Sequence, residues 1–393
     1  MPLDTLLVVY PLQPPSLVDD LRKVFKTVHN WPILAGNDYS GRVVPLPPPE
    51  VLADADVILC FHLPSNLKDW SQTPKLKLLQ LVGAGAFQVT NTDFYRSIPA
   101  DSPLILSNST VQGFLLSKTC VHDRDGAQSQ TDAGRSAYNI LLNWRDHQAP
   151  FLKIHDVNRK EQRWMAPTEL GTAGFGGQFI QEIRGQTFGV IGYGHLGREV
   201  GRLAQAFGAR LIACTREGAP KVIGGYILSG TGDKGGTNPE AYYKTGNKAS
   251  LHEFLGRCDV VINALPASHE TNKFLGREEF TAMRNSAIVV NIGRGETMDH
   301  DSLVEALQAP GERDDSTGKL MLRGASLDVT DPEPLPTGHI LFSLSNVILT
   351  PHVSWASKVN FLRAVELLGI NKTRIDAGEG ALNALRGVGE KIH

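Results

Sequence analysis

The chain has 393 residues, enough for two domains that each bury a hydrophobic core. Hydrophobic residues make up 41% and charged residues 20%, and the formal net charge is −2. This composition indicates a globular protein with no general attraction to nucleic acid or acidic membranes. No stretch approaches the roughly 20 apolar residues of a membrane span, and the start lacks a basic leader. We therefore expect a cytoplasmic protein.

The four cysteines, Cys60, Cys120, Cys214 and Cys258, are scattered and lack the spacing of metal ligands. Three of them lie in or beside apolar runs, so we expect buried thiols rather than disulfides, and no metal.

Short apolar runs recur along the chain and predict strands. They cover residues 6–10, 56–61, 76–82, 103–107, 187–192, 209–214, 258–264, 286–292, 325–329 and 346–350. Most are unbroken rather than alternating, which is typical of parallel sheets covered by helices on both faces. The fold class is therefore α/β, with two doubly wound, Rossmann-like domains.

Two helices and one loop stand out between the strands. After Gly194, apolar residues from Leu196 to Phe207 recur at helical spacing, and Gly208 ends this helix. A second helix is capped by Asp301. Residues 219–247 are rich in Gly and Lys, and we expect a long surface loop there.

Residues 187–197, TFGVIGYGHLG, contain the motif G-x-G-x-x-G between a strand and a helix. Gly192 allows the tight turn, Gly194 lets the backbone approach a pyrophosphate, and Gly197 lets helix and strand pack closely. The N–H groups near His195 and Leu196 would face the phosphates. The motif therefore predicts a dinucleotide site that also includes Tyr193. We interpret His195 as a solvated loop residue and not as a catalytic group.

The end of the next strand should select the dinucleotide. An acidic residue there would bind the ribose 2′-hydroxyl of NAD, but this chain has Thr215 and Arg216. A hydroxyl and a guanidinium suit a 2′-phosphate, so we expect NADP to be preferred over NAD. Alternatively, Arg216 stacks on adenine or faces solvent.

Three segments at strand ends carry the groups that a hydride-transfer site needs: NIGRGETMD (291–299), LDVTDPEP (327–334) and TPHVSWAS (350–357). Strand ends of one parallel sheet meet at a common edge, so Arg294, Glu333 and His352 could converge. The arginine could hold the carboxylate of a 2-oxo acid, and the histidine could protonate its carbonyl oxygen. The glutamate would favour the protonated imidazole. Each residue alone could instead be an ion-pair, loop or capping residue.

These motifs, in this order after GYGHLG, resemble the D-isomer-specific 2-hydroxyacid dehydrogenase family, with GTGD (230–233) and DPEPLP closest to its fungal branch. The resemblance implies that Arg294 binds substrate, that His352 is the acid/base and that Glu333 is its partner, in a cleft between the domains. It further implies a homodimer. The implied contacts with the cofactor are Asp328, Leu265, Pro266, Thr271, Ile292 and Gly293, together with Arg294 and His352. Those with the substrate, besides Arg294, are Gly83, Ala84, Gly85 and Trp355.

By the same resemblance, residues 1–135 completed by 354–393 form the substrate-binding domain, and residues 136–353 form the NAD(P)-binding domain. Two departures from the family pattern stand out. Residues 113–136 are polar and lack the expected Ala-Glu helix start, as in an insertion or an aberrantly translated stretch. The substrate loop continues Gly85-Ala86-Phe87, where many relatives place an Asp.

The expected activity is interconversion of a small 2-oxo acid, such as glyoxylate or hydroxypyruvate, and its D-2-hydroxy acid, in the reductive direction with NADPH. A formate-type dehydrogenase is disfavoured by Glu333, because by resemblance that enzyme has a glutamine there. A dinucleotide-sensing protein of the corepressor type is the main alternative. An inactive product, disrupted at residues 113–136, is a third.

Overall fold

The computed structural model describes residues 2–32, 46–109, 158–164, 183–308, 322–344, 346–354 and 358–386. The chain divides into two compact units. Unit 1 comprises Met1–Leu115, Gly224–Leu228 and Ser357–His393, and unit 2 comprises Leu116–Ile223 and Ser229–Ala356. A five-residue segment inside the predicted cofactor domain thus belongs to unit 1. The departure predicted at residues 113–136 lies outside the described residues, as do Cys120 and Trp355.

Unit 1 contains a six-stranded sheet in the order β13-β5-β4-β3-β1-β2. Its strands are β1 (Thr5–Val8), β2 (Thr27–Asn30), β3 (Val57–Cys60), β4 (Leu78–Leu81), β5 (Ile105–Ser107) and β13 (Ala384–Arg386). All pairings are parallel except that of β13 with β5. The four predicted strands are confirmed, and β2 and β13 are additions. Neither strand contains the apolar run that predicts a strand, because both lie at an edge of the sheet. Strand β2, for example, has no fully buried residue.

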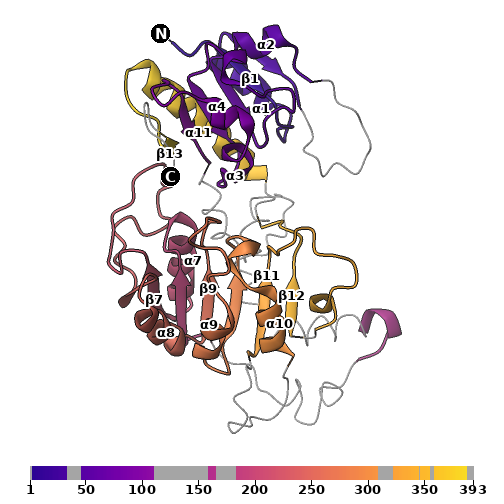
Figure 1. Ribbon diagram of the computed structural model, residues 1–393, viewed down its shortest axis with the longest axis vertical. Coiled ribbons are helices and arrows are strands. Elements are labelled where there is room, and N and C mark those ends of the chain that lie inside the picture. Colours follow the sequence, from indigo (N-terminus) through magenta and orange to yellow (C-terminus); the bar gives the residue numbers. More distant parts are fainter. Residues whose placement is uncertain are drawn as a thin grey trace. The chain divides into compact units, whose positions relative to one another are not determined.

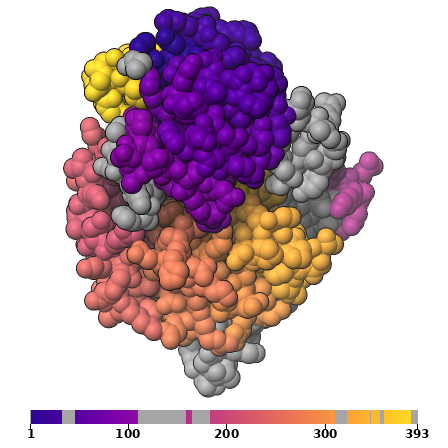
Figure 2. Space-filling model, turned by 45° about the horizontal axis from the view of Figure 1, so that its top comes forward, coloured from indigo at the N-terminus to yellow at the C-terminus, as the bar shows by residue number. Residues whose placement is uncertain are grey.

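The helices of unit 1 come from both ends of the chain. They are α1 (Leu17–Val24), α2 (Pro49–Asp54), α3 (Phe87–Thr90), α4 (Asp93–Ser97) and α11 (Lys358–Asp376), with a 3-10 turn at Trp70–Gln72. Helix α11 packs beside α1, and the Leu3 N–H donates to the Asp376 carboxylate at 2.7 Å. Figures 1 and 2 show the yellow C-terminal residues directly beside the indigo N-terminal ones.

Unit 2 contains a seven-stranded, entirely parallel sheet in the order β12-β11-β10-β9-β6-β7-β8. Its strands are β6 (Thr187–Ile191), β7 (Arg210–Thr215), β8 (Ala241–Lys244), β9 (Val260–Asn263), β10 (Ile288–Asn291), β11 (Gly324–Leu327) and β12 (Val347–Leu349). Six were predicted. Strand β8 corrects the prediction of a loop over 219–247, since this short segment pairs with β7 and buries only Tyr243.

Helices cover both faces of this sheet, as the unbroken apolar strands predict. They are α7 (His195–Ala206), α8 (Lys248–Arg257), α9 (Arg277–Ala282) and α10 (His300–Leu307), with 3-10 turns at Gly295–Thr297 and Ile340–Phe342. Alternate strand residues enter two separate cores: Val190 packs with α7, whereas Ile191 packs with α8, α9 and α10. Figure 1 shows these helices along the parallel strands.

The cysteines of both units are buried free thiols where described, as predicted. Burial raises the pKa of Cys60, Cys214 and Cys258, that of Cys214 to about 12, so these thiols stay protonated at neutral pH. Among the described helices, none has the length and apolar character needed to cross a bilayer.

The start of α10 differs from the prediction. The helix begins at His300, and its N-cap is Asp299, whose carboxylate accepts the Ser302 N–H at 2.9 Å, so the assignment of the cap to Asp301 was wrong. The predicted helical spacing extended equally well from either aspartate. The Ser302 N–H and the Lys273 ammonium, 2.9 Å from the carboxylate, lower the pKa of Asp299 to about 2.

This cap should give a measurable pH dependence of stability. Because the folded pKa lies below the ordinary value of 3.8, the charged cap stabilises fully above about pH 4. That contribution is lost as the pH falls toward 2. We expect Asp299→Ala to cost about 1 kcal/mol at pH 7. Asp299→Asn keeps an acceptor, so its difference from the wild type should shrink between pH 5 and pH 2.5 in urea unfolding. An unchanged difference would contradict the assignment.

Candidate active site

The three predicted catalytic residues follow three neighbouring strands of unit 2. Arg294 follows β10, Glu333 follows β11, and His352 follows β12, in a sheet where these strands are adjacent and parallel. Their carboxyl ends therefore lie at one edge of the sheet. The structure brings the histidine and the glutamate into direct contact, and the Arg294 charge is near enough to lower the pKa of Glu333.

At this edge of the sheet, His352 and Glu333 form a direct side-chain contact. The Nδ1 atom of His352 lies 2.7 Å from Oε1 of Glu333, with side chains 33% and 43% exposed. Burial alone raises the pKa of Glu333, but the His352 hydrogen bond and charge outweigh it and hold that pKa below its ordinary value. The glutamate is therefore a carboxylate at neutral pH. Because Nδ1 faces the carboxylate, Nε2 is the nitrogen available to a reactant.

Asp328 holds the loop that carries His352. Its buried carboxylate accepts the Thr350 hydroxyl at 2.6 Å and the N–H groups of Val353 and Ser354 at 3.1 and 3.2 Å. The His352 N–H donates to the Asp328 carbonyl at 2.9 Å. These bonds fix His352 in a left-handed conformation, with φ of 50°, that few non-glycine residues adopt. The predicted contact of Asp328 with a nicotinamide carboxamide stays a prediction.

A buried polar network that the sequence analysis missed holds the backbone of Arg294. The Arg294 carbonyl accepts the Asn291 side-chain amide at 3.0 Å and the Thr297 hydroxyl at 2.5 Å. Asn263 donates to both, at 3.2 Å to Asn291 and at 2.6 Å to Thr297. These three side chains are fully buried. Asparagines at the ends of two buried strands were the available signal, because buried amides need partners.

Gly295 joins the arginine loop to the glutamate loop. A Cβ built on this glycine would lie 2.0 Å from the Thr330 carbonyl oxygen, closer than any side chain can approach. The second glycine of NIGRG is therefore required by contact with the segment that bears Glu333. The motif by itself predicted no role for Gly295.

The glycine loop has the geometry that a dinucleotide requires. Gly192 has a φ of +84°, and a Cβ on Gly197 would lie 2.6 Å from the Gly192 carbonyl oxygen. A Cβ on Gly194 would meet no described atom within 4 Å, so the backbone there borders open space. Gly194 is also the N-cap of α7, whose first-turn N–H groups can receive a phosphate. The residues present therefore fit a pyrophosphate. His195, half-buried, is the first residue of α7, and Leu196 follows it.

Tyr193 differs from the other predicted cofactor residues. Its side chain is buried, and its hydroxyl donates to Asp233 at 3.0 Å. Burial and the Asp233 charge raise the pKa of this phenol far above its ordinary value. The tyrosine is thus directed at residues beyond the glycine loop, and only its backbone faces the loop itself.

The remaining predicted cofactor residues line the same edge. Arg216 is 80% exposed and forms an ion pair with Glu270 at 3.1 Å, while the Thr215 hydroxyl accepts the Gly218 N–H at 3.0 Å. A Cβ on Gly293 would lie 2.4 Å from the Leu265 carbonyl oxygen. Of the others, Leu265 and Ile292 are buried, Pro266 is exposed, and the Thr271 hydroxyl donates to the Pro266 carbonyl at 2.6 Å.

The predicted substrate loop lies in unit 1, directly after β4. Its three carbonyl groups accept hydrogen bonds: Gly83 from the Ser109 N–H at 3.0 Å, Ala84 from the Asn108 amide at 2.6 Å, and Gly85 from Gln88 at 3.0 Å. These bonds fix the peptide planes of the loop.

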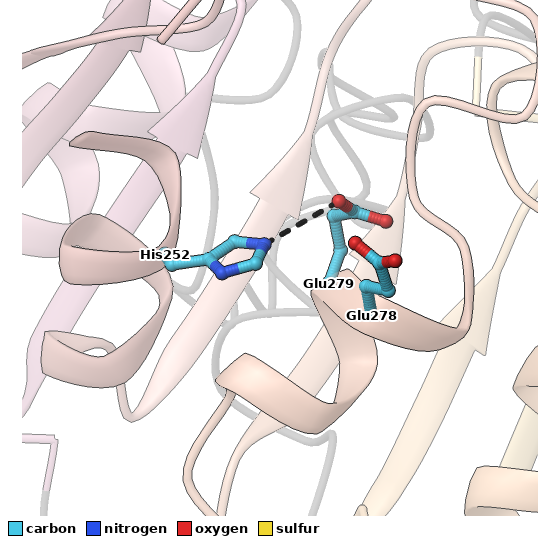
Figure 3. Close-up of side chains that lie close together, drawn as sticks. All are labelled: His252, Glu278 and Glu279. Atoms are coloured by element: carbon cyan, nitrogen blue, oxygen red, sulfur yellow. Dashed lines mark ion pairs between the residues drawn. The ribbon is translucent and has the colours of Figure 1, made fainter. Parts of the chain in front are cut away.

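One cluster of possible metal ligands occurs among the described residues, away from the catalytic motifs (Figure 3). It comprises His252 of α8 and Glu278 and Glu279 of α9, with ligand atoms within 4.8 Å of one another. Glu278 pairs with Lys248, and Glu279 accepts the Gly276 N–H at 3.1 Å while facing His252 at 3.5 Å. These partners account for the carboxylates as a link between two helices, and we assign no metal to them.

Fold and site together define a dinucleotide-binding α/β protein with an Arg–Glu–His constellation. Residues 152–354 match the family model "D-isomer specific 2-hydroxyacid dehydrogenase, NAD binding domain". The chain belongs to this family, as the sequence motifs predicted, and it carries the family's NAD-binding domain.

Curated relatives include enzymes of the same kind, and solved structures share the fold. A glyoxylate reductase from Thermococcus gammatolerans is 34% identical over 176 residues, 45% of this chain and 44% of that enzyme. The chain therefore spans less than half the length of this relative. A putative 2-hydroxyacid dehydrogenase from Haemophilus influenzae is 26% identical over 312 residues, 78% of this chain and 80% of the relative. A family structure from Xanthobacter autotrophicus, solved with NADPH and MES, has a TM-score of 0.67 at 19% identity and covers 98% of both chains. At this identity the likeness shows the fold alone.

Proposed function

We propose that this protein is a nicotinamide-dependent D-2-hydroxyacid dehydrogenase that reduces small 2-oxo acids of the glyoxylate and hydroxypyruvate kind. The observation that carries the proposal is the 2.7 Å contact between His352 Nδ1 and Glu333 Oε1, beside the charge of Arg294. The relatives named glyoxylate reductase support the same substrate class.

Each residue has a chemical role in this reaction. The Arg294 guanidinium binds the substrate carboxylate and draws electron density from the neighbouring carbonyl. His352 Nε2 donates its proton to the carbonyl oxygen, and the Glu333 carboxylate stabilises the imidazolium and fixes its orientation. A bound nicotinamide dinucleotide supplies the reducing equivalent, with its pyrophosphate held at Gly192–Gly197. The backbone of Gly83–Gly85 holds the substrate carboxylate from unit 1. We also propose a cytoplasmic homodimer.

The test is the loss of NADPH absorbance, and separately NADH absorbance, with glyoxylate, hydroxypyruvate, pyruvate and longer 2-oxo acids. We expect oxidation of the dinucleotide with at least one short acid. Protein that binds a dinucleotide but turns over none of these acids would instead be a sensor of the corepressor type.

We further propose that NADP is preferred over NAD. Arg216 can give up its ion pair with Glu270 at little cost and bind a 2′-phosphate instead. Its pair with Glu270 is highly exposed on both sides, and such surface pairs contribute about 0–1 kcal/mol. A 2′-phosphate would give the guanidinium a charge-assisted bond of about 1.5–3 kcal/mol. Arg216→Ala should therefore lower kcat/KM for NADPH by about 10- to 100-fold and leave that for NADH unchanged.

Arg210 at the opposite end of β7 provides a matched control. It forms an exposed pair with Glu240 at 3.0 Å, so Arg210→Ala removes the same kind of interaction far from the predicted ribose site. Equal use of NADH and NADPH by the wild type would end the Arg216 assignment and leave the reaction standing.

A further inference from the structure

A chain segment between β7 and β8 belongs to both units. We call residues 221–236 the strap. Its ends lie in unit 2, whereas Gly224–Leu228 belong to unit 1. The strap was predicted to be part of a surface loop, yet it buries Tyr226 and Asp233. A solvated loop would not require such contacts at both its tip and its base.

The base of the strap is fixed to the glycine loop. Arg198, buried in the first turn of α7, donates to the carbonyls of Lys221 (2.7 Å) and Asp233, and to that of Tyr193 at 3.0 Å. The Asp233 carboxylate accepts the Tyr193 hydroxyl at 3.0 Å. Burial raises the pKa of Asp233, but neighbouring N–H groups, Tyr193 and Arg198 hold it below its ordinary value, so it is a carboxylate.

A second buried residue of α7 repeats this arrangement. Glu199 accepts the strap's Gly232 N–H at 2.6 Å and pairs with Arg202 at 2.7 Å. Two consecutive charged residues at the phosphate-binding end of α7 are therefore buried to hold the strap. Such burial is costly unless each charged group is paired or hydrogen-bonded. Glu199 pairs with Arg202, and Arg198 donates to three carbonyl groups.

The tip of the strap is fixed in unit 1. Tyr226 packs on Leu367 of α11, and the Tyr226 N–H donates to the Asn383 side-chain oxygen at 2.8 Å. The phenol also bonds to Glu366, and burial together with this carboxylate raises the pKa of Tyr226 to about 12. Gly225, with φ of +94°, packs against the same side-chain oxygen of Asn383. A Cβ on Gly225 would lie 2.2 Å from that oxygen.

From Asn383 a hydrogen-bonded path leads to the predicted substrate loop. The Asn383 amide donates to the Asn108 carbonyl at 3.4 Å, and the Asn108 N–H donates to the Asn383 carbonyl at 3.3 Å. The Asn108 side chain in turn donates to the Ala84 carbonyl at 2.6 Å.

A buried network flanks this path. The Asn371 amide of α11 donates to Gln80 at 3.0 Å and to the Leu382 carbonyl at 3.3 Å. Gln80 lies on β4, the strand that ends at the loop.

We propose that the strap mechanically couples the glycine loop of unit 2 to the Gly83–Gly85 loop of unit 1, with Asn383 and Asn108 as positioning residues. Binding of a dinucleotide phosphate at the glycine loop would restrict Tyr193 and Arg198, and through the strap it would stabilise the loop that receives the substrate carboxylate. The proposal rests on the proposed function for its ligands. Its mechanical part, however, is a property of the protein alone.

Hydrogen exchange of the full-length protein, without ligand, tests the mechanical part. In Tyr226→Ala we expect faster exchange both at residues 78–90 and at residues 192–200, at opposite ends of the path. The matched control is Val222→Ala, which removes a 69% exposed side chain of the same strap and should leave both regions unchanged. Faster exchange confined to the strap, or none, would overturn the proposal.

A second variant tests the proposal even if Tyr226→Ala does not fold. Asn383→Asp keeps the oxygen that accepts the Tyr226 N–H but removes the amide that donates to Asn108. Of the two hydrogen bonds between Asn383 and Asn108, only the one from the Asn108 N–H to the Asn383 carbonyl then remains. We expect faster exchange at residues 78–90 and wild-type exchange at 192–200, because the path is weakened between these two asparagines. Wild-type exchange at residues 78–90 in this variant would exclude these asparagines as positioning residues.

The same measurement with NADPH or NADH tests the coupling. In the wild type, the dinucleotide should slow exchange at residues 187–200 and, by about fivefold or more, at residues 78–90. In Tyr226→Ala, protection should persist at 187–200 and be lost at 78–90. Equal protection of 78–90 in both proteins would overturn the coupling. No protection of 187–200 in any protein would instead count against the proposed function, and the ligand-free comparison would still decide the inference.

Discussion

His352→Gln is expected to lower kcat for the reduction of a short 2-oxo acid by about 10²–10⁴-fold, the usual contribution of a general acid. Glutamine can donate a hydrogen bond through its amide, but it cannot transfer a proton, because the amide is not an acid near neutral pH. Dinucleotide affinity should change little, because the imidazole contacts Glu333, while the bond of this loop to Asp328 comes from the His352 backbone N–H, which the substitution keeps. Fluorescence titration with NADPH separates the two quantities. A variant with near-wild-type kcat would remove His352 from the mechanism.

The partner carboxylate should show its effect in the pH profile. The His352 contact holds the pKa of Glu333 below its ordinary value, so this side chain is a carboxylate throughout the neutral range. In Glu333→Gln the imidazolium loses this charge. We expect kcat at pH 7 to fall, and the loss of activity that protonation of Glu333 causes in acid to disappear from the pH profile.

The surface pair of His29 and Asp54, 3.5 Å apart in unit 1, provides the control. Asp54→Asn removes a similar charge from a histidine far along the chain from the catalytic motifs. It should leave the profile in place. A profile that is the same in Glu333→Gln and the wild type would contradict the supporting role of the glutamate.

Most of the strands could be predicted from the sequence, because buried parallel strands are continuous apolar runs. Ten such runs are strands, and the G-x-G-x-x-G motif follows β6 as expected. Strands β2, β8 and β13 were missed because edge strands bury little and so lack this pattern. The side-chain partners in the site could not be predicted by the same means, because they depend on which loops meet.

Particular residues illustrate this limit. Glu333 and His352 are 19 residues apart in the sequence. They meet because each follows one of two adjacent strands, β11 and β12. Gly295 looks like an ordinary loop glycine, yet its close contact with the Thr330 carbonyl holds the Arg294 loop. Asn291, at the end of β10, indicates only that a buried amide needs partners, and its bond to the Arg294 carbonyl could not be predicted from it. The strap is the larger omission. Its Gly- and Lys-rich sequence is typical of a solvated loop, whereas tertiary contacts of Tyr226 and Asp233 decide its conformation.

Arg294 should be intolerant even of lysine. A planar guanidinium can form two parallel bonds with a carboxylate, whereas an ammonium acts as a point charge and cannot reproduce this geometry. Each lost charge-assisted bond costs about 1.5–3 kcal/mol, so we expect Arg294→Lys to lower kcat/KM for the 2-oxo acid by about 10- to 100-fold. Arg294→Ala should lower it further. The loop backbone should keep its place in both, because the Asn263–Asn291–Thr297 network bonds to the Arg294 carbonyl. The bond that the guanidinium itself makes to the backbone, at 2.7 Å, is to the carbonyl of its neighbour Gly293.

This separation of side chain from backbone provides the control. Thr297→Val removes the hydroxyl that donates to the Arg294 carbonyl, and Asn263 then loses a buried partner. It should therefore lower the melting temperature by several degrees as well as activity, since a broken buried network costs stability. Arg294→Lys should lower activity at an unchanged melting temperature. If Arg294→Lys keeps wild-type kcat/KM, the arginine does not bind the substrate carboxylate. If it instead lowers the melting temperature as much as Thr297→Val does, Arg294 acts on the fold, and the substrate carboxylate must be held by the backbone of Gly83–Gly85 alone.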